Sequence, residues 1–146
     1  MKLELKHLAA YLPYEVNFIS GMDKPYNEFG RQPQWTLDGI TTLFGDCCLT
    51  TKENRDAYAI QTCNLILRQL SDLTKEITVN GETFVPINKL VKQELIGTHI
   101  FESMIIDRIK EKTMSFKISE KLFEWHFDVF GLIEAGLAID INTLEK

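Results

Sequence analysis

Three histidines and three cysteines are the residues of this chain whose side chains most often do chemistry. His126 and Asp128 stand two positions apart. On a helix, residues with that spacing point in different directions, so they are poorly placed to bind one metal ion together. We therefore expect His126 to be a partly buried structural histidine that is hydrogen-bonded through one ring nitrogen. His7 and His99 belong to no recognisable metal-ligand motif.

The cysteines lack the spacing of a zinc or redox pair. Cys47 and Cys48 are adjacent, and Cys63 has no histidine neighbour. The chain also has no glycine-rich phosphate loop, no nucleophile elbow and no zinc-protease motif. The sequence therefore predicts no catalytic residue, no metal ligand and no cofactor, and it leans against an enzyme. A site assembled in space from the three histidines or the cysteines, as in a small hydrolase, stays open.

Length and charge limit the classes of protein to consider. The 146 residues, 45% hydrophobic and 25% charged, predict one globular domain over residues 1–146. The net charge of −5, without a basic stripe, disfavours binding to nucleic-acid phosphates. No apolar run approaches the ~20 residues of a membrane span. An odd number of cysteines is typical of reduced thiols, so we expect a cytoplasmic protein that does not enter the membrane.

The elements that position these residues are clearest toward the C-terminus. In the segment 122–136, apolar side chains recur every three or four positions, which predicts an aromatic core helix with Ser119 as its cap and Gly136 as its terminator. The expected core residues are Leu122, Phe123, Trp125, His126, Phe127, Phe130 and Ile133. If one face of this helix exceeds what a small core can bury, the chain is expected to form a homodimer.

A β-hairpin is predicted in the middle of the chain. Residues 76–79 and 82–85 flank Asn80 and Gly81, which suit a type I′ turn. Ser71 is expected to cap a single turn over residues 71–75, and Pro86 to open a helix at about residues 87–96. A second helix is expected over residues 100–112, capped by Thr98, with Phe101, Met104, Ile105 and Ile109 on one face. A short closing strand over residues 137–141 completes this part.

The N-terminal half reads as an irregular β region. The pattern predicts one helical turn at residues 5–12 stopped by Pro13, a strand at 14–19, and a long loop at 20–33. Strand pieces at 35–37 and 40–44 are expected around a tight turn at Asp38 and Gly39, followed by a strand at 47–51 and a polar turn at 52–56. Residues 58–67 fit a β run, with helix as the alternative. The predicted class is α+β: an N-terminal irregular β region, a central β-hairpin, and C-terminal helices with an aromatic core helix.

Three groups of segments, taken together, resemble a known kind of protein. They are residues 2–8 (KLELKHL) with 11–14 (YLPY); residues 67–68 (LR) and 70–77 (LSDLTKEI) with 80–82 (NGE) and 84–86 (FVP); and residues 121–133 (KLFEWHFDVFGLI) with 136–140 (GLAID). This arrangement resembles short uncharacterised proteins encoded in prophages and other mobile elements of Bacteroides-type gut bacteria. The resemblance implies a context of phage or mobile DNA, and no mechanism.

The matching segments coincide with the strongest fold signals, so we expect residues 66–146 to form a scaffold. This scaffold would present a variable recognition surface from residues 15–64. The aromatic residues Tyr26, Phe29, Trp35 and Tyr58 are the candidate interaction surface, with core packing as the favoured alternative for them because lysines and arginines are not interleaved. The expected function is a non-enzymatic binding or adaptor protein of phage or mobile-element origin, acting on a host or phage protein. The alternatives are a nucleic-acid-associated phage protein and an acidic inhibitor of a host nucleic-acid enzyme.

Overall fold

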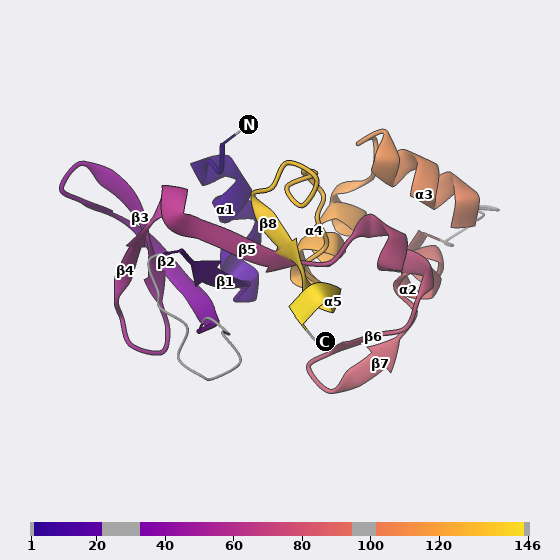
Figure 1. Ribbon diagram of the computed structural model, residues 1–146. Coiled ribbons are helices and arrows are strands. Elements are labelled where there is room, and N and C mark those ends of the chain that lie inside the picture. The colour runs from indigo at the N-terminus through magenta and orange to yellow at the C-terminus, as the bar shows by residue number, and fades with distance from the viewer. Residues whose placement is uncertain (1, 22–32, 95–101, 145–146) are drawn as a thin grey trace.

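A computed structural model describes residues 2–21, 33–94 and 102–144 and combines a six-stranded sheet with helices (Figure 1). The strand order in the sheet is β4-β3-β2-β1-β5-β8. All neighbouring strands are antiparallel except β5 and β8, which are parallel. The strands are β1 (Asn17–Ser20), β2 (Trp35–Leu43), β3 (Asp46–Thr51), β4 (Ala57–Ala59), β5 (Cys63–Leu67) and β8 (Ala138–Asp140). The predicted α+β class is confirmed.

The helices and a separate hairpin complete the fold. The α-helices are α1 (Leu5–Tyr11), α2 (Pro86–Glu94), α3 (Glu102–Lys110), α4 (Phe116–Glu124) and α5 (Ile141–Leu144), and the hairpin pairs β6 (Ile77–Val79) with β7 (Glu82–Phe84). Short 3-10 turns are η1 (Leu12–Tyr14), η2 (Ile60–Thr62) and η3 (Leu70–Thr74). Figure 1 shows β2, β3 and β4 at one end of the molecule and α2, α3 and the hairpin at the other, with β5 running between them.

Two clusters of buried apolar side chains hold these parts together. The first joins α1 to the large sheet and includes Tyr11, Phe18, Leu65 and Leu132. The second lies among η3, α2, α3 and α4; its members include Leu73, Leu90, Ile105, Ile118 and Leu122. Phe123 packs against both clusters. Because each large apolar side chain gains roughly 1.5–3 kcal/mol when it leaves water, these two clusters are the main source of stability.

Several local predictions are confirmed. The hairpin turns at Asn80 and Gly81, whose φ angles of 50° and 82° are those of a type I′ turn. Pro86 is the first residue of α2, the strand predicted at 47–51 is β3, and the closing strand is β8. The turn of helix before Pro13 is α1, followed by a 3-10 turn that contains this proline. Thr98, His99 and Phe101, most of the predicted loop 20–33 and the segment between α2 and α3 lie outside the described residues.

Other local predictions are wrong. Asp38 and Gly39 do not form a turn, because β2 runs on through them with a shift of register against β3 between Leu37 and Gly39. The run 58–67 does form β structure as expected, in β4 and β5, but η2 interrupts it, and the alternative of an α-helix is wrong. Ser71 lies inside η3, whose first flanking residue is Gln69, so Ser71 caps nothing. Met104 of α3 is exposed while Ile105 and Ile109 of the same helix are buried.

The predicted bounds of the aromatic helix are also wrong. α4 begins earlier, where the Ser115 hydroxyl accepts a hydrogen bond from the Ile118 N–H, and Ser119 lies inside the helix. The helix ends at Glu124, since His126 adopts the left-handed conformation with φ 60°. The His126 N–H donates to the Phe123 carbonyl at 3.0 Å and the Phe127 N–H donates to the Leu122 carbonyl at 2.8 Å. This pair of bonds is the Schellman pattern that closes a helix, with histidine where glycine is usual.

A tertiary contact explains why the helix stops there. Phe127 forms a parallel β-bridge with Arg68: the Arg68 N–H donates to the His126 carbonyl and the Asp128 N–H donates to the Arg68 carbonyl, both at 2.8 Å. The Asp128 carboxylate then accepts from the N–H groups of Leu132 and Ile133 at 2.7 and 2.8 Å, which starts a turn that ends at Gly136. The apolar side chains of residues 122–136 therefore belong to three different structures: the end of α4, the β-bridge and the turn that follows it.

Candidate interaction surface on the β2–β3 hairpin

The turn between β2 and β3 places an aromatic side chain in a conformation that such residues rarely adopt. Leu43 pairs with Asp46, so Phe44 and Gly45 are the two residues of the turn, and their φ angles are 51° and 85°. Two positive φ angles define the type I′ turn that suits the twist of a hairpin. Glycine adopts this conformation readily, but a residue with a Cβ atom loses roughly 1–2 kcal/mol in it.

The ring of Phe44 is also fully exposed. Its relative accessibility is 102%, the highest of any large apolar side chain in the ranges 2–21, 33–94 and 102–144, and its neighbour Leu43 is 44% exposed. An exposed phenylalanine forgoes roughly 1.5–3 kcal/mol of burial. Phe44 is thus unfavourable for the turn and adds nothing to the packing of the fold. A strained backbone at an exposed aromatic residue is the observation from which a hypothesis of function can start.

The base of this hairpin is anchored in the first core. Leu37 of β2 and Leu49 of β3 are buried, and the rings of Trp35 and Tyr58 stack at 6.0 Å with an interplanar angle of 26°. Tyr58 also contacts Phe18 edge-on at 6.1 Å. The tip therefore projects from a sheet that is held in place by packing at its other end, which gives the Leu43–Phe44 pair a defined direction.

The structure brings together only part of the aromatic surface expected from the sequence. Trp35 and Tyr58 do lie side by side, but both are half-buried against the first core. Tyr26 and Phe29 lie outside the described residues. Phe44 was missed because the pattern 40–44 reads as strand to its last residue. The available signal was Gly45 followed by Asp46, a turn pair between two β runs.

The residues expected in the aromatic core divide into two groups. Three of them are buried, namely Leu122, Trp125 and Phe127. The other four are half-buried, namely Phe123, His126, Phe130 and Ile133.

The ring of His126 is hydrogen-bonded, as expected: its Nε2 atom donates to the Tyr14 carbonyl at 2.7 Å. Burial lowers the pKa of His126 below its ordinary value, the bond to Tyr14 partly opposes this, and the nearby Arg68 charge lowers it further. The neutral ring is the form that this environment favours.

The other residues with chemical potential are spread over the fold. On α1, the Nδ1 atom of His7 accepts from the Glu4 N–H at 3.0 Å, and its ring meets Phe130 at 5.0 Å. Cys48 and Cys63 are buried, Cys47 is half-buried, and none of the three forms a disulfide. Within the described residues, no three histidine, cysteine, aspartate or glutamate side chains gather as a metal site would require.

Comparison with known proteins adds no family assignment. The chain matches no family model, and neither a curated protein nor a solved structure is significantly similar to it. In the part of the chain that the structure describes, none of the helices has the length and apolar character that crossing a membrane requires.

Proposed function

We propose that this chain is a non-enzymatic binding or adaptor protein of phage or mobile-element origin that docks the β2–β3 tip onto a partner protein. The observation that carries the proposal is the fully exposed ring of Phe44 at a φ angle of 51°. The origin in this proposal rests on the sequence resemblance alone. All three cysteines are free thiols, which supports a cytoplasmic location in this proposal.

The geometry of the tip suits an anchor residue. Aromatic side chains that enter a pocket on the partner dominate many protein interfaces. A two-residue turn allows little conformational freedom, so binding orders few additional bonds and costs little entropy. Burial of the Phe44 ring in such a pocket would recover roughly 1.5–3 kcal/mol that the isolated chain forgoes. The partner site that fits this tip is therefore an apolar pocket wide enough for a phenyl ring and flanked by room for Leu43.

The test compares two exposed phenylalanines. Phe44→Asn removes the ring and places an Asn-Gly pair in a type I′ turn, so the hairpin is retained. Phe116→Asn is the matched control, because Phe116 is 78% exposed at the start of α4, away from the tip. Each variant and the unmodified chain are used as bait in a lysate of bacteria that carry the phage or mobile element. We expect a protein that the unmodified chain and Phe116→Asn retain and that Phe44→Asn loses.

Retention of the same proteins by Phe44→Asn would contradict the proposal. A second copy of this chain is the other possible occupant of the tip. Light scattering at high protein concentration distinguishes the two cases. If the unmodified chain is a dimer and Phe44→Asn is a monomer, the partner is a second copy of the chain. If the unmodified chain and Phe44→Asn are both monomers, the partner is a different protein.

A further inference from the structure

Part of β2 forms an open edge of the six-stranded sheet. β1 pairs with β2 at residues 35–36, and the Leu37 N–H donates to the Val16 carbonyl at 2.9 Å. Beyond that point, residues 39–43 pair with β3 on one side, and no strand within the described residues pairs with them on the other. Figure 1 shows this end of the β2–β3 hairpin projecting away from β1 and α1. We call residues 39–43 the open edge.

The pairing register identifies which backbone groups point outward from the open edge. In an antiparallel pair, two opposite residues either exchange both of their hydrogen bonds or direct both away from each other. The Thr51 N–H donates to the residue that precedes β4, so Leu49 and Cys47, which alternate with it along β3, also direct their bonds toward β4. Their partners on β2, Ile40 and Thr42, therefore each direct an N–H and a C=O outward.

The open edge also lacks the features that usually keep strand edges from pairing. Natural edges carry charged side chains, prolines or bulges. Residues 39–44 (GITTLF) contain no charge and no proline, and isoleucine and threonine favour extended backbone. The register shift between Leu37 and Gly39 lies at the inner end of this stretch and leaves the ladder up to Leu43 regular. These residues therefore suit the approach of another strand.

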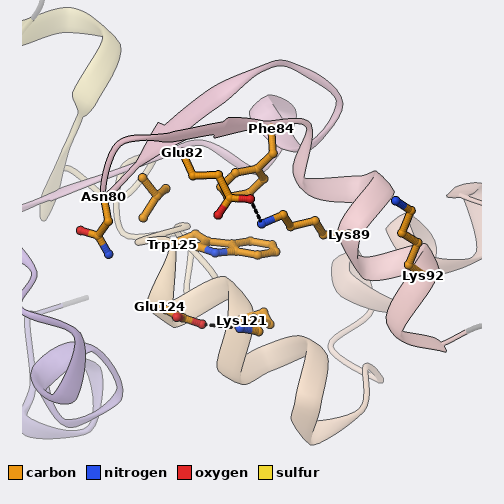
Figure 2. A pocket seen from close by; sticks show the side chains of 9 residues that line it. Asn80, Glu82, Phe84, Lys89, Lys92, Lys121, Glu124 and Trp125 are labelled. Atoms are coloured by element: carbon orange, nitrogen blue, oxygen red, sulfur yellow. Dashed lines mark hydrogen bonds and ion pairs between the residues drawn. The ribbon is translucent and has the colours of Figure 1, made fainter.

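A charged cavity at the opposite end of the molecule differs in this respect. Its volume is about 500 Å³, and it lies between the β6–β7 hairpin, α2 and the end of α4, where the rings of Phe84 and Trp125 pack at 5.0 Å (Figure 2). Most of the charged side chains that line it form two ion pairs, Lys89–Glu82 at 2.5 Å and Lys121–Glu124 at 2.9 Å. The polar groups there have partners within the chain, whereas the outward groups of the open edge have none among the described residues.

We propose that the open edge pairs with the open edge of a second copy of this chain, in antiparallel direction about a two-fold axis at Thr41. In this register, Ile40 of each copy lies opposite Thr42 of the other. Each of these two pairs exchanges both of its hydrogen bonds, so every outward N–H and C=O of both copies is bonded. Leu43, which is 44% exposed, lies opposite Gly39 of the other copy and on the same face, where glycine has no side chain to exclude it.

The open edge favours a second copy over an unrelated strand because it is complementary to itself. A two-fold axis brings the same residues of both copies together, so the spacing of donors and acceptors matches without any further requirement. The pairing also brings no like charges together, since residues 39–43 are uncharged. The ladder ends at Leu43 and does not include the Phe44 ring. This inference therefore does not rest on the partner protein proposed for Phe44.

A cysteine at the two-fold axis tests the register. Thr41 of one copy lies opposite Thr41 of the other in a pair that exchanges no hydrogen bonds, where the Cα atoms are about 4.5 Å apart, a distance that a disulfide can span. Thr41→Cys should therefore form an interchain disulfide under mild oxidation. Thr50→Cys is the matched control, because Thr50 is also half-buried and lies on the same face of the hairpin, but on β3. The three native cysteines are present in both variants and in the unmodified chain, which gives the background.

A proline on the open edge tests the hydrogen bonds. Thr42→Pro removes an outward N–H from each copy, and so two of the interchain bonds, but no bond to β3. Thr42→Val keeps the N–H with a side chain of the same shape. By sedimentation over a range of concentrations, we expect the unmodified chain, Thr42→Val and Phe44→Asn to dimerise, and Thr42→Pro to stay monomeric where they are dimers. Circular dichroism checks that Thr42→Pro is folded, and the cysteine pair decides the matter if it is not.

Several results would overturn the proposal. They are a monomeric unmodified chain at the highest concentration, a Thr42→Pro variant that dimerises like the unmodified chain, a Thr50→Cys variant that cross-links as readily as Thr41→Cys, and a dimer that Phe44→Asn abolishes. A dimer that survives Phe44→Asn and is lost in Thr42→Pro supports pairing through the open edge. The lysate experiment with Phe44→Asn and Phe116→Asn tests the proposed function separately, so either proposal can fail without the other.

Discussion

The Nε2 atom of His126 lies 2.7 Å from the backbone carbonyl oxygen of Tyr14, across a sequence separation of 112 residues. This hydrogen bond ties the end of α4 to the 3-10 turn that follows α1. His126 adopts the left-handed backbone conformation just after the end of α4. The hydrogen bond to Tyr14 fixes the orientation of its ring. His126 is therefore one of the residues that join the N-terminal segment to the aromatic segment, together with Tyr11.

The first prediction concerns stability toward acid. Burial lowers the pKa of both His126 and His7 below the ordinary 6.5, so the unfolded chain takes up these protons at higher pH than the folded chain does. Stability is therefore fully present above about pH 6.5 and is lost as pH falls below it, by at most about 1.4 kcal/mol per pH unit for each histidine. Urea unfolding at a series of pH values measures this slope.

His126→Asn is the informative variant for that slope, because asparagine tolerates the left-handed backbone and carries an N–H donor but does not titrate. We expect a shallower loss of stability between neutral and mildly acidic pH, with the contribution of His7 retained. An unchanged slope in His126→Asn would show that other groups cause the acid sensitivity.

The second prediction is that Phe44→Asn stabilises the fold. Asparagine is the preferred first residue of a type I′ turn before glycine, so the strain at φ 51° is relieved and the free energy of unfolding rises by about 1 kcal/mol. Phe44→Ala removes the ring but keeps a side chain that disfavours this conformation, so it should show no comparable gain. Thermal unfolding of both variants measures the difference. A less stable Phe44→Asn would mean that the ring supports the isolated fold.

The third prediction concerns Tyr11, which is completely buried beneath the aromatic segment. Its hydroxyl donates to the Phe127 carbonyl at 2.5 Å and accepts from the Val129 N–H at 3.4 Å. Tyr11→Phe removes both bonds, but the Val129 N–H still donates to the Phe127 carbonyl at 3.0 Å, so the free energy of unfolding should fall by roughly 0.5–1.5 kcal/mol. Tyr14→Phe, at a half-buried tyrosine of η1, is the control and should change stability little. Chemical denaturation compares the two, and equal losses would contradict the role assigned to the Tyr11 hydroxyl.

The fourth prediction concerns the turn that follows the bridge. The buried Asp128 carboxylate accepts from two backbone N–H groups, much as a capping residue does at the start of a helix. Asp128→Ala should lower the free energy of unfolding by roughly 1–3 kcal/mol, since two N–H groups lose their acceptor. Asp107→Ala, on the exposed side of α3, should change it little. Amide hydrogen exchange at Leu132 and Ile133 should accelerate in Asp128→Ala only, and protection that persists there would argue against this capping.

The fifth prediction addresses the nucleic-acid alternative. A chain with a net charge of −5 has little to gain from releasing counterions on binding phosphates, so we expect no binding to single- or double-stranded DNA at low salt. Titration of labelled oligonucleotides with increasing salt measures this. Binding that weakens steeply with salt would restore the nucleic-acid alternative.

Local sequence signals predicted the elements whose geometry depends on a few neighbouring residues. Asn80 and Gly81 form the expected turn because both can adopt positive φ angles, and Pro86 opens α2 because its fixed φ suits a first helical position. Phe44 shows the limit of this reasoning, since nothing in local preference predicts a phenylalanine in a left-handed turn.

The chain by itself thus determined the α+β class, the central hairpin and which segments are apolar enough to be buried. Tertiary structure decided where α4 ends, because the backbone of His126 and Asp128 bonds to Arg68, the residue that directly follows β5. It also decided that Trp125 lines a charged cavity and that Phe44 stands in water. The apolar periodicity of the sequence predicts which side chains are buried. The backbone conformation in which they are buried depends on hydrogen bonds between segments that are distant in the sequence.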